Sequence, residues 1–162
     1  MAKARKPVAE IAAEMGMALL TPHISCKDCA KAMDFYKAAF GAEEVMRLPG
    51  PDGRLMHASM RINGAMLLMN DAFPEYGGHS PESLGGTPVT LHLMVDDADA
   101  VAAKAVAAGA TVVMEVADQF WGDRYGVVKD PFGHHWSIAT PAWPLKTEED
   151  LQAAGKSAMG MS

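Results

Sequence analysis

The sequence predicts an α+β protein made of two tandem βαβββ modules, whose curved mixed sheets surround a cavity. The first observation behind this prediction is an internal repeat, because the stretch from Thr90 to Ser137 matches an earlier stretch at one constant spacing. A match of this kind indicates two copies of one structural unit. The second observation is that both stretches pass through the same succession of strand and helix patterns. The matched pairs are His23 with His92, Asp28 with Asp97, Ala38 with Ala107, Ala39 with Ala108, and Gly64 with Gly133.

Length and composition are those of an ordinary globular protein. The chain has 162 residues, of which 49% are hydrophobic and 21% charged, enough for one domain with a sizeable core or for two small fused modules. The formal net charge is −6, and a basic cluster is found only at Lys3, Arg5 and Lys6. Nucleic-acid binding requires a field of Lys and Arg, so we expect no nucleic-acid partner.

The N-terminal stretch indicates neither a membrane span nor a secretion signal. No apolar run reaches the roughly 18 residues of a transmembrane helix, so no membrane partner is expected. Glu10 and Glu14 interrupt what would be the apolar core of a signal peptide, which favours a cytoplasmic location. Cys26 and Cys29 are too few for a disulfide framework. Their Cys-x-x-Cys spacing imitates a redox motif, but no thioredoxin-like pattern surrounds it.

Residues 18–26 alternate between polar and apolar side chains and predict a half-buried strand with Thr21, His23 and Ser25 on one face. Asp28 is a suitable N-cap for the helix that follows. Its apolar residues recur at helical spacing as far as Phe40, and Gly41 ends it.

Three further strands complete the first module. They are predicted over residues 43–48, 54–62 and 65–70. The first two are joined by a turn rich in Pro and Gly at residues 49–53, and the last two by Asn63-Gly64, the sequence signature of a two-residue hairpin. The strand over residues 54–62 places His57, Ser59 and Arg61 on one face, which lies either in the cavity or in solvent.

The second module repeats this order. Its predicted elements are a strand over 89–95, an alanine-rich helix that starts at Asp96-Asp97 and ends at Gly109, and strands over 111–116, 124–129 and 135–140. Asp130-Pro131-Phe132-Gly133 suits a type I turn between the last two strands. We therefore divide the chain into an arm of residues 1–17, one domain of residues 18–142, and a tail of residues 143–162. The domain is made of two modules, residues 18–75 and 88–142. The tail is predicted to contain a helix at 147–154 that is capped by Thr147 with Asp150.

Four segments resemble a known family. They are residues 34–42 of the first helix, the turn at 49–53, residues 119–126, and residues 130–134. Over about residues 18–142 the chain resembles the vicinal oxygen chelate superfamily, which has the glyoxalase/bleomycin resistance/dihydroxybiphenyl dioxygenase fold, and within it the PhnB-like branch. The resemblance implies a small molecule held in a β-sheet cavity.

The resemblance also implies where a metal ion would bind in metal-dependent members. The first and last strands of each module supply one ligand each, and these positions are here Thr21, Leu68, Thr90 and Ser137. None is a usual metal ligand. We therefore predict no metal ligands and no resident cofactor; the alternative is a zinc, nickel or iron ion held by the cavity histidines.

Polar residues on the predicted cavity face and at its rim are the candidate functional residues. His23 and His92 are predicted to be catalytic, or to face each other and hold an anionic ligand; the alternative is that they only bond water and backbone. Arg124 beside aromatic residues suits a carboxylate or phosphonate, although a salt bridge to Asp123 would explain it equally well. The predicted ligand-binding residues are His57, Asn70, Trp121, Arg124, Tyr125, His135 and Ser137.

Two function classes stay open. One is a glyoxalase- or bleomycin-resistance-like protein that binds a small oxygenated or anionic molecule without the usual metal site. The other is a metal-dependent lyase, isomerase or dioxygenase of glyoxalase type that uses the cavity histidines. A module of this kind exposes sheet edges and an open face, so a homodimer is expected in either case.

Overall fold

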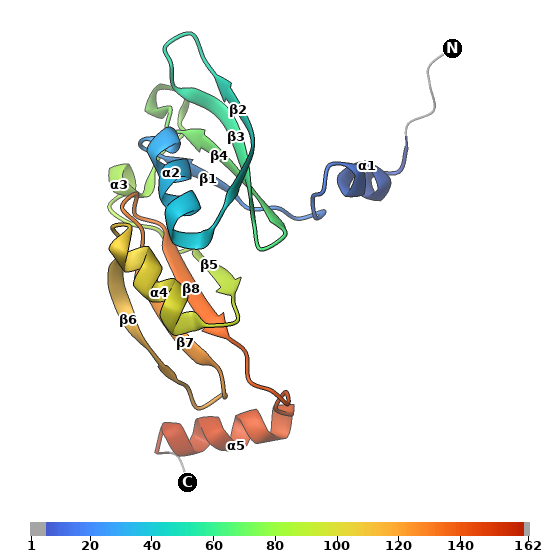
Figure 1. The fold of residues 1–162 in the computed structure, drawn as a ribbon, viewed down its shortest axis with the longest axis vertical. Helices are drawn as coiled ribbons and strands as arrows, with labels where there is room; N and C mark the ends of the chain where they lie inside the picture. Colours follow the sequence, from blue (N-terminus) through green and yellow to red (C-terminus); the bar gives the residue numbers. More distant parts are fainter. Residues whose placement is uncertain (1–5, 161–162) are drawn as a thin grey trace. The chain divides into compact units, whose positions relative to one another are not determined.

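The computed structural model describes residues 6–160, and the chain divides into two units, Met1–Leu84 and Gly85–Ser162. Each unit contains one four-stranded mixed sheet with a helix packed on one face (Figure 1). The predicted α+β class and the duplicated βαβββ order are therefore confirmed. Within residues 6–160, no helix has the length and apolar character needed to cross a lipid bilayer.

The first unit contains the N-terminal helix and the first sheet. Its elements are α1 (Val8–Glu14), β1 (His23–Cys26), α2 (Cys29–Phe40), β2 (Glu43–Pro49), β3 (Leu55–Ile62), β4 (Ala65–Asp71), the short 3-10 helix η1 (Pro74–Tyr76) and α3 (Pro81–Leu84). The strand order is β1-β4-β3-β2, with β1 parallel to β4 and the other pairs antiparallel. Helix α2 packs against β1, β3 and β4, so side chains that alternate along these strands point either toward α2 or away from it.

The second unit has the same plan. Its elements are β5 (Thr90–Met94), α4 (Ala98–Ala107), β6 (Thr111–Asp118), β7 (Arg124–Lys129), β8 (His135–Thr140) and α5 (Glu148–Ala158). The strand order is β5-β8-β7-β6, with β5 parallel to β8. The register repeats as well, because His23 is paired with Leu68 and His92 with Ser137. The internal repeat in the sequence is thus a repeat in sheet topology.

Strand β1 is shorter than predicted, since it begins at His23 and not at Ala18. The reason is Pro22, which has no N–H to donate to a sheet. Its carbonyl still accepts a hydrogen bond from the Leu68 N–H at 3.0 Å. In the second unit Leu91 takes the place of Pro22 and pairs with Trp136, so β5 extends back to Thr90.

Both sheet helices begin and end close to the predicted residues. The carboxylates of Asp28 and Asp97 accept hydrogen bonds from the backbone N–H groups of Lys31 and Ala100, which confirms both N-caps. Gly41 adopts a left-handed conformation with φ of 65°, as expected of a residue that ends a helix. The buried face of α2 is large and aromatic, whereas that of α4 is made of alanine. The buried residues are Cys29, Ala32, Met33, Phe35, Tyr36, Ala39 and Phe40 in α2, and Ala98, Ala102 and Ala105 in α4.

The hairpin between the last two strands differs between the units by one residue. Asn63 and Gly64 both have positive φ and close the β3–β4 hairpin between Ile62 and Ala65, as predicted. The β7–β8 turn contains one residue more, because Asp130 bonds to His134 across it. As a consequence, the third strand of the second unit is displaced by one position relative to the repeat, and Tyr125 stands where the first unit has His57.

The predicted linker and tail are more ordered than their composition indicates. Residues 71–87 include η1 and α3. In the tail, α5 runs four residues beyond the predicted end at Ala154, and Thr147 and Asp150 form the predicted capping box.

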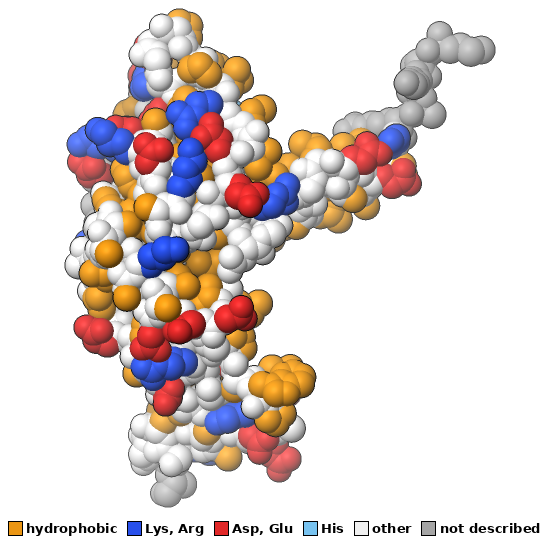
Figure 2. Space-filling model, viewed as in Figure 1, with side chains coloured by type: hydrophobic (Ala, Val, Ile, Leu, Met, Phe, Trp, Pro, Cys, Tyr) orange, Lys and Arg blue, Asp and Glu red, His pale blue; other side chains and the backbone are white. Residues whose placement is uncertain are grey.

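Charged side chains are interspersed on the surface. On the face drawn in Figure 2, Lys and Arg side chains lie among Asp and Glu rather than in one continuous basic field. In the first unit, Arg47 and Lys37 both bond to Glu44 and lower the pKa of its carboxyl to about 2. The expected absence of a nucleic-acid partner stays a prediction. The homodimer also stays a prediction, although the edge strand β2 exposes Val45, Met46 and Leu48.

Candidate functional site

A cluster of polar and aromatic side chains around His92, the His92 cluster, lies on the face of the second sheet that points away from α4. Nδ1 of His92 in β5 is hydrogen-bonded to Oγ of Ser137 in β8 at 2.8 Å. The ring of Tyr125 in β7 is stacked beside His92, with 6.3 Å between ring centroids. Ser137 is only 2% exposed, whereas His92 reaches the surface. The buried hydroxyl therefore fixes the orientation of an imidazole whose Nε2 is the nitrogen that would meet a ligand.

Trp121 extends this cluster as an aromatic wall. Its ring meets Tyr125 edge to face at 5.4 Å between centroids. Its Nε1–H donates to Oδ2 of Asp123 at 3.1 Å, and Oδ1 of Asp123 accepts from the backbone N–H of Ala142 at 3.0 Å. Asp123 thus positions the indole. Its role was missed in the sequence, where the spacing of Trp121 and Asp123 is the available signal.

Gly126 is required where β6 crosses close to β7. A Cβ atom at this position would lie 2.7 Å from a methyl carbon of Val116 and 2.9 Å from its backbone nitrogen. Glycine removes this clash at a point where β6 also departs from regular register.

The first unit carries a second histidine cluster, on the face away from α2. The rings of His23 and His57 meet edge to face with 5.8 Å between centroids. Next to them, Asn70 donates from Nδ2 to Oγ of Ser25 at 3.1 Å and to the backbone oxygen of Asp71 at 2.7 Å. The structure therefore brings together two predicted residues, His23 and His57, that the sequence placed on separate strands.

The two clusters are equivalent but differ in chemistry. His23 corresponds to His92, and His57 corresponds to Tyr125 because of the one-residue difference between the hairpins. The position of Ser137 is occupied by Leu68 in the first unit, so His23 has no matching hydroxyl beside it. The second cluster is accordingly the better defined of the two. The meeting of His23 and His92 in one cavity stays a prediction.

Arg124 does not join the His92 cluster. Tyr125 points away from α4, so its neighbour Arg124 points toward α4. There the guanidinium of Arg124 forms an ion pair with Asp99 in the first turn of α4. Nη1 also donates to Asp118 at 3.1 Å. The alternative salt bridge between Arg124 and Asp123 is therefore wrong: the partners of Arg124 are Asp99 and Asp118.

His135 lies on the same strand face as Ser137, two residues along β8, beside Lys129 and Thr90.

The four metal positions implied by the resemblance do not fit a metal ion. Leu68 has no donor atom, and Thr21, Thr90 and Ser137 offer neutral hydroxyls in place of carboxylates or imidazoles. In the part of the chain from residue 6 to residue 160, no group of three or more His, Cys, Asp or Glu side chains could hold a metal ion.

The Cys-x-x-Cys motif is part of the core. Cys26 and Cys29 are both fully buried, and burial raises the pKa of the Cys29 thiol to about 12. A thiol becomes reactive as an accessible thiolate, so neither is expected to react in the folded protein. With Ellman's reagent at pH 8, we expect the two thiols to react at least about 100-fold more slowly in the native state than in urea. Rapid reaction of either thiol in the native protein would contradict this assignment.

The architecture defines the class: a duplicated βαβββ protein with polar and aromatic side chains on the sheet face that its helix leaves uncovered. The chain belongs to the Glyoxalase/Bleomycin resistance protein/Dioxygenase superfamily, whose family model matches residues 17–138. This confirms the resemblance seen in the sequence.

Mycobacterial proteins are similar in sequence to this chain. An uncharacterized protein of Mycobacterium bovis is 56% identical over 83% of this chain and 90% of its own length. CFP32 of Mycobacterium tuberculosis, which carries a provisional glyoxylase name, is 38% identical over 68% of this chain and 39% of its own length.

Solved structures show the same fold. TioX from Micromonospora sp. ML1 has a TM-score of 0.62 and 26% identity, and the match covers 76% of this chain and 98% of TioX. A PhnB protein from Bacillus cereus has a TM-score of 0.60 with 19% identity over 76% of this chain and 99% of PhnB. The PhnB-like architecture predicted from the sequence is therefore confirmed.

Proposed function

We propose that the chain binds a small oxygenated molecule on the His92 face without using a metal ion. The observation that carries the proposal is the cluster of His92, Ser137, Tyr125 and Trp121. Its members come from separate strands and a loop, and hydrogen bonds or ring contacts hold each one in place.

The cluster combines the two features of a small-molecule site, a few polar groups and an apolar wall. Nε2 of His92 can donate to or accept from a carbonyl, hydroxyl or carboxyl group, depending on its protonation state. The rings of Tyr125 and Trp121 offer flat surface for the remainder of the ligand. A carboxylate would be favoured further when His92 is protonated.

The family supports this proposal in general terms, since its name joins enzymes with bleomycin-resistance proteins. A second candidate is an enzyme that acts on the same ligand. It is supported by the hydrogen bond between His92 and Ser137, because an imidazole oriented in this way is suited to general acid–base catalysis. The provisional glyoxylase name of CFP32 points in the same direction.

Three probes test the proposal by isothermal titration calorimetry: benzoate, catechol and phenylphosphonate. We expect at least one of them to bind, and its affinity to fall about tenfold or more in His92→Ala because the polar anchor is lost. The same substitution should lower the free energy of unfolding by about 1 kcal/mol, since the buried Ser137 hydroxyl loses its partner.

The control is His79→Ala, which removes an exposed histidine from the connecting segment of residues 71–87 and should leave the affinity for the probe unchanged. If no probe binds, or if His92→Ala binds like the wild type while losing several kcal/mol of stability, the proposal fails and the histidine is structural. Consumption of a bound probe during the titration, followed by its ultraviolet absorbance, would favour the enzyme candidate.

A further inference from the structure

The first unit contains a pocket that is separate from both histidine clusters. It has a volume of about 490 Å³ and is lined by Gly50, Pro51, Asp52, Arg54, Met56, Phe73 and Tyr76. The lining includes neither His23 nor His57. Met56 lies where β2 and β3 shift register, since Leu48 is paired with His57 but Pro49 with Leu55, and this irregularity turns the start of β3 toward the turn at residues 49–53.

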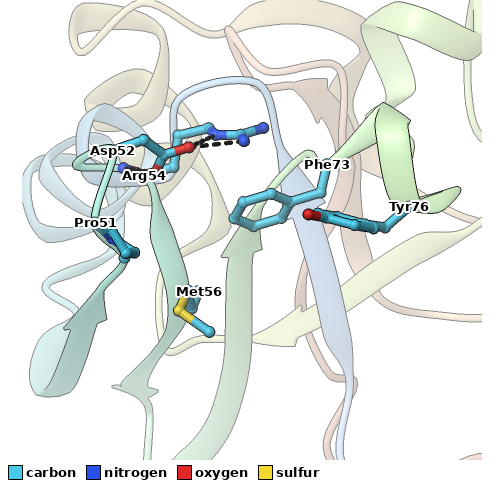
Figure 3. Close-up of a pocket in the computed structure, with 7 residues that line it drawn as sticks. Pro51, Asp52, Arg54, Met56, Phe73 and Tyr76 are labelled. Carbon is cyan, nitrogen blue, oxygen red and sulfur yellow. Dashed lines mark hydrogen bonds and ion pairs between the residues drawn. The ribbon is translucent and has the colours of Figure 1, made fainter.

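The walls of this pocket combine two aromatic rings with the apolar side chains of Pro51 and Met56. Figure 3 shows the rings of Phe73 and Tyr76 across from Pro51 and Met56. A Cβ atom on Gly50 would lie 3.2 Å from Cγ of Met56, so glycine keeps this side of the pocket open. Ligand pockets of roughly 300 to 1,000 Å³ with such linings are typical of small-molecule sites.

The loop that presents the two aromatic rings has a defined conformation. The backbone N–H groups of Tyr76 and Gly78 both donate to the carbonyl of Phe73, each at 2.9 Å, and Phe73 forms an antiparallel bridge with Gly78. Gly77 adopts the left-handed conformation, with φ of 80°, that ends η1. Yet Tyr76 is 85% exposed. A large aromatic side chain held at a pocket mouth in this way gains contact area only when something occupies the pocket.

The charges around the pocket are set by Arg54. Its guanidinium carbon lies 4.2 Å from the centroid of the Phe73 ring. It forms ion pairs with Asp52 and Glu75 and donates to the backbone oxygen of Ala72 at 3.3 Å. These bonds raise the pKa of Arg54 and lower the pKa values of Asp52 and Glu75, so the three groups together carry one net negative charge at neutral pH.

We propose that this pocket binds a planar aromatic molecule that is neutral or carries one positive charge. The aromatic walls favour a flat apolar body. The guanidinium of Arg54 already contacts two carboxylates and a carbonyl, and the two carboxylates exceed its charge, so it does not attract an anion. The excess carboxylate charge favours an amine or another cationic group near Asp52 and Glu75.

Fluorescence titration with three dyes tests the proposal: neutral N-phenyl-1-naphthylamine, cationic proflavine and anionic 8-anilinonaphthalene-1-sulfonate. We expect saturable binding of the first two and weaker binding of the anion. Tyr76→Ala should weaken binding of the neutral and cationic dyes about five- to tenfold, because one aromatic wall is lost. Glu75→Gln should weaken proflavine about threefold or more and leave the neutral dye unchanged, because only the charge is altered.

The matched control is Trp143→Ala, which removes an equally exposed aromatic side chain, 87% exposed, from outside the pocket. His92→Ala should also leave dye binding unchanged, which separates this pocket from the proposed function. Circular dichroism of Tyr76→Ala verifies that the fold is retained. Equal loss in Tyr76→Ala and Trp143→Ala, no loss in Tyr76→Ala, or tighter binding of the anion would each overturn the proposal.

Discussion

Replacing Asp71 with Ala is expected to lower the free energy of unfolding by about 3 to 5 kcal/mol. Asp71 ends β4 and is only 6% exposed. Its Oδ1 accepts from the Cys29 backbone N–H at 2.7 Å, and its Oδ2 accepts from the Leu55 backbone N–H at 2.6 Å. One carboxylate therefore joins the first turn of α2 to the start of β3, and alanine leaves two buried donors without an acceptor.

Urea denaturation followed by circular dichroism measures this loss. Asp71→Asn keeps one acceptor oxygen and should fall between the wild type and Asp71→Ala. In the second unit, Oγ1 of Thr140 accepts from the Ala98 backbone N–H at 2.9 Å, so Thr140→Val should cost about 1 kcal/mol. Asp34→Ala, on the exposed face of α2, is the matched control. A loss below about 1 kcal/mol in Asp71→Ala would show that water replaces the carboxylate.

The elements that could be predicted from the sequence depend on local chemistry. Asp28 caps its helix, Gly41 ends it, and Asn63-Gly64 forms its hairpin, because each outcome is decided by conformations within a few residues. The constant spacing between His23 and His92 then indicated the duplicated βαβββ order, since equal patterns of strands and helices pack in equal ways.

Parts of the site depend on contacts between distant residues and were not predicted. The partner of Arg124 is Asp99, which reaches it only because α4 packs on the face of β7 from which Arg124 projects. Asp123 is adjacent in sequence, but its carboxylate is occupied by Trp121 and Ala142. The correspondence of His57 with Tyr125 depends on one additional residue in a turn, which a repeat read at constant spacing does not reveal.

The aromatic pocket was missed for a related reason. Residues 71–87 are rich in Gly, Ser and Pro, a composition typical of linkers. Two features in the sequence were available as signals: Phe73 and Tyr76 lie three residues apart, and Pro74 between them favours the first turn of a helix. Their juxtaposition with Arg54 and Met56 follows from the position of β4 beside β3, which only the structure gives.

The largest loss of stability is expected for Asp130→Ala, about 4 to 6 kcal/mol, because two buried donors and one part-buried donor lose the same carboxylate acceptor. Asp130 is 2% exposed and follows β7 directly. Oδ1 accepts from the backbone N–H groups of Phe132 and His134, both at 2.9 Å, and Oδ2 accepts from Nε1–H of Trp136, also at 2.9 Å. The side chain thus organises the turn and joins it to the indole that β8 buries against α4. Ser137, the partner of His92, directly follows Trp136 in β8.

A double-mutant cycle separates these contributions in urea denaturation followed by tryptophan fluorescence. Trp136→Phe retains the ring and removes the donor, so the coupling between Asp130→Ala and Trp136→Phe should be about 1 to 2 kcal/mol, and the rest of the loss belongs to the turn. Asp96→Ala, an exposed carboxylate before α4, serves as the control and should change stability by less than about 0.5 kcal/mol. If Asp130→Ala costs less than about 1.5 kcal/mol, or if the two substitutions are additive, the carboxylate does not hold the hairpin and Ser137 must be positioned by the sheet alone.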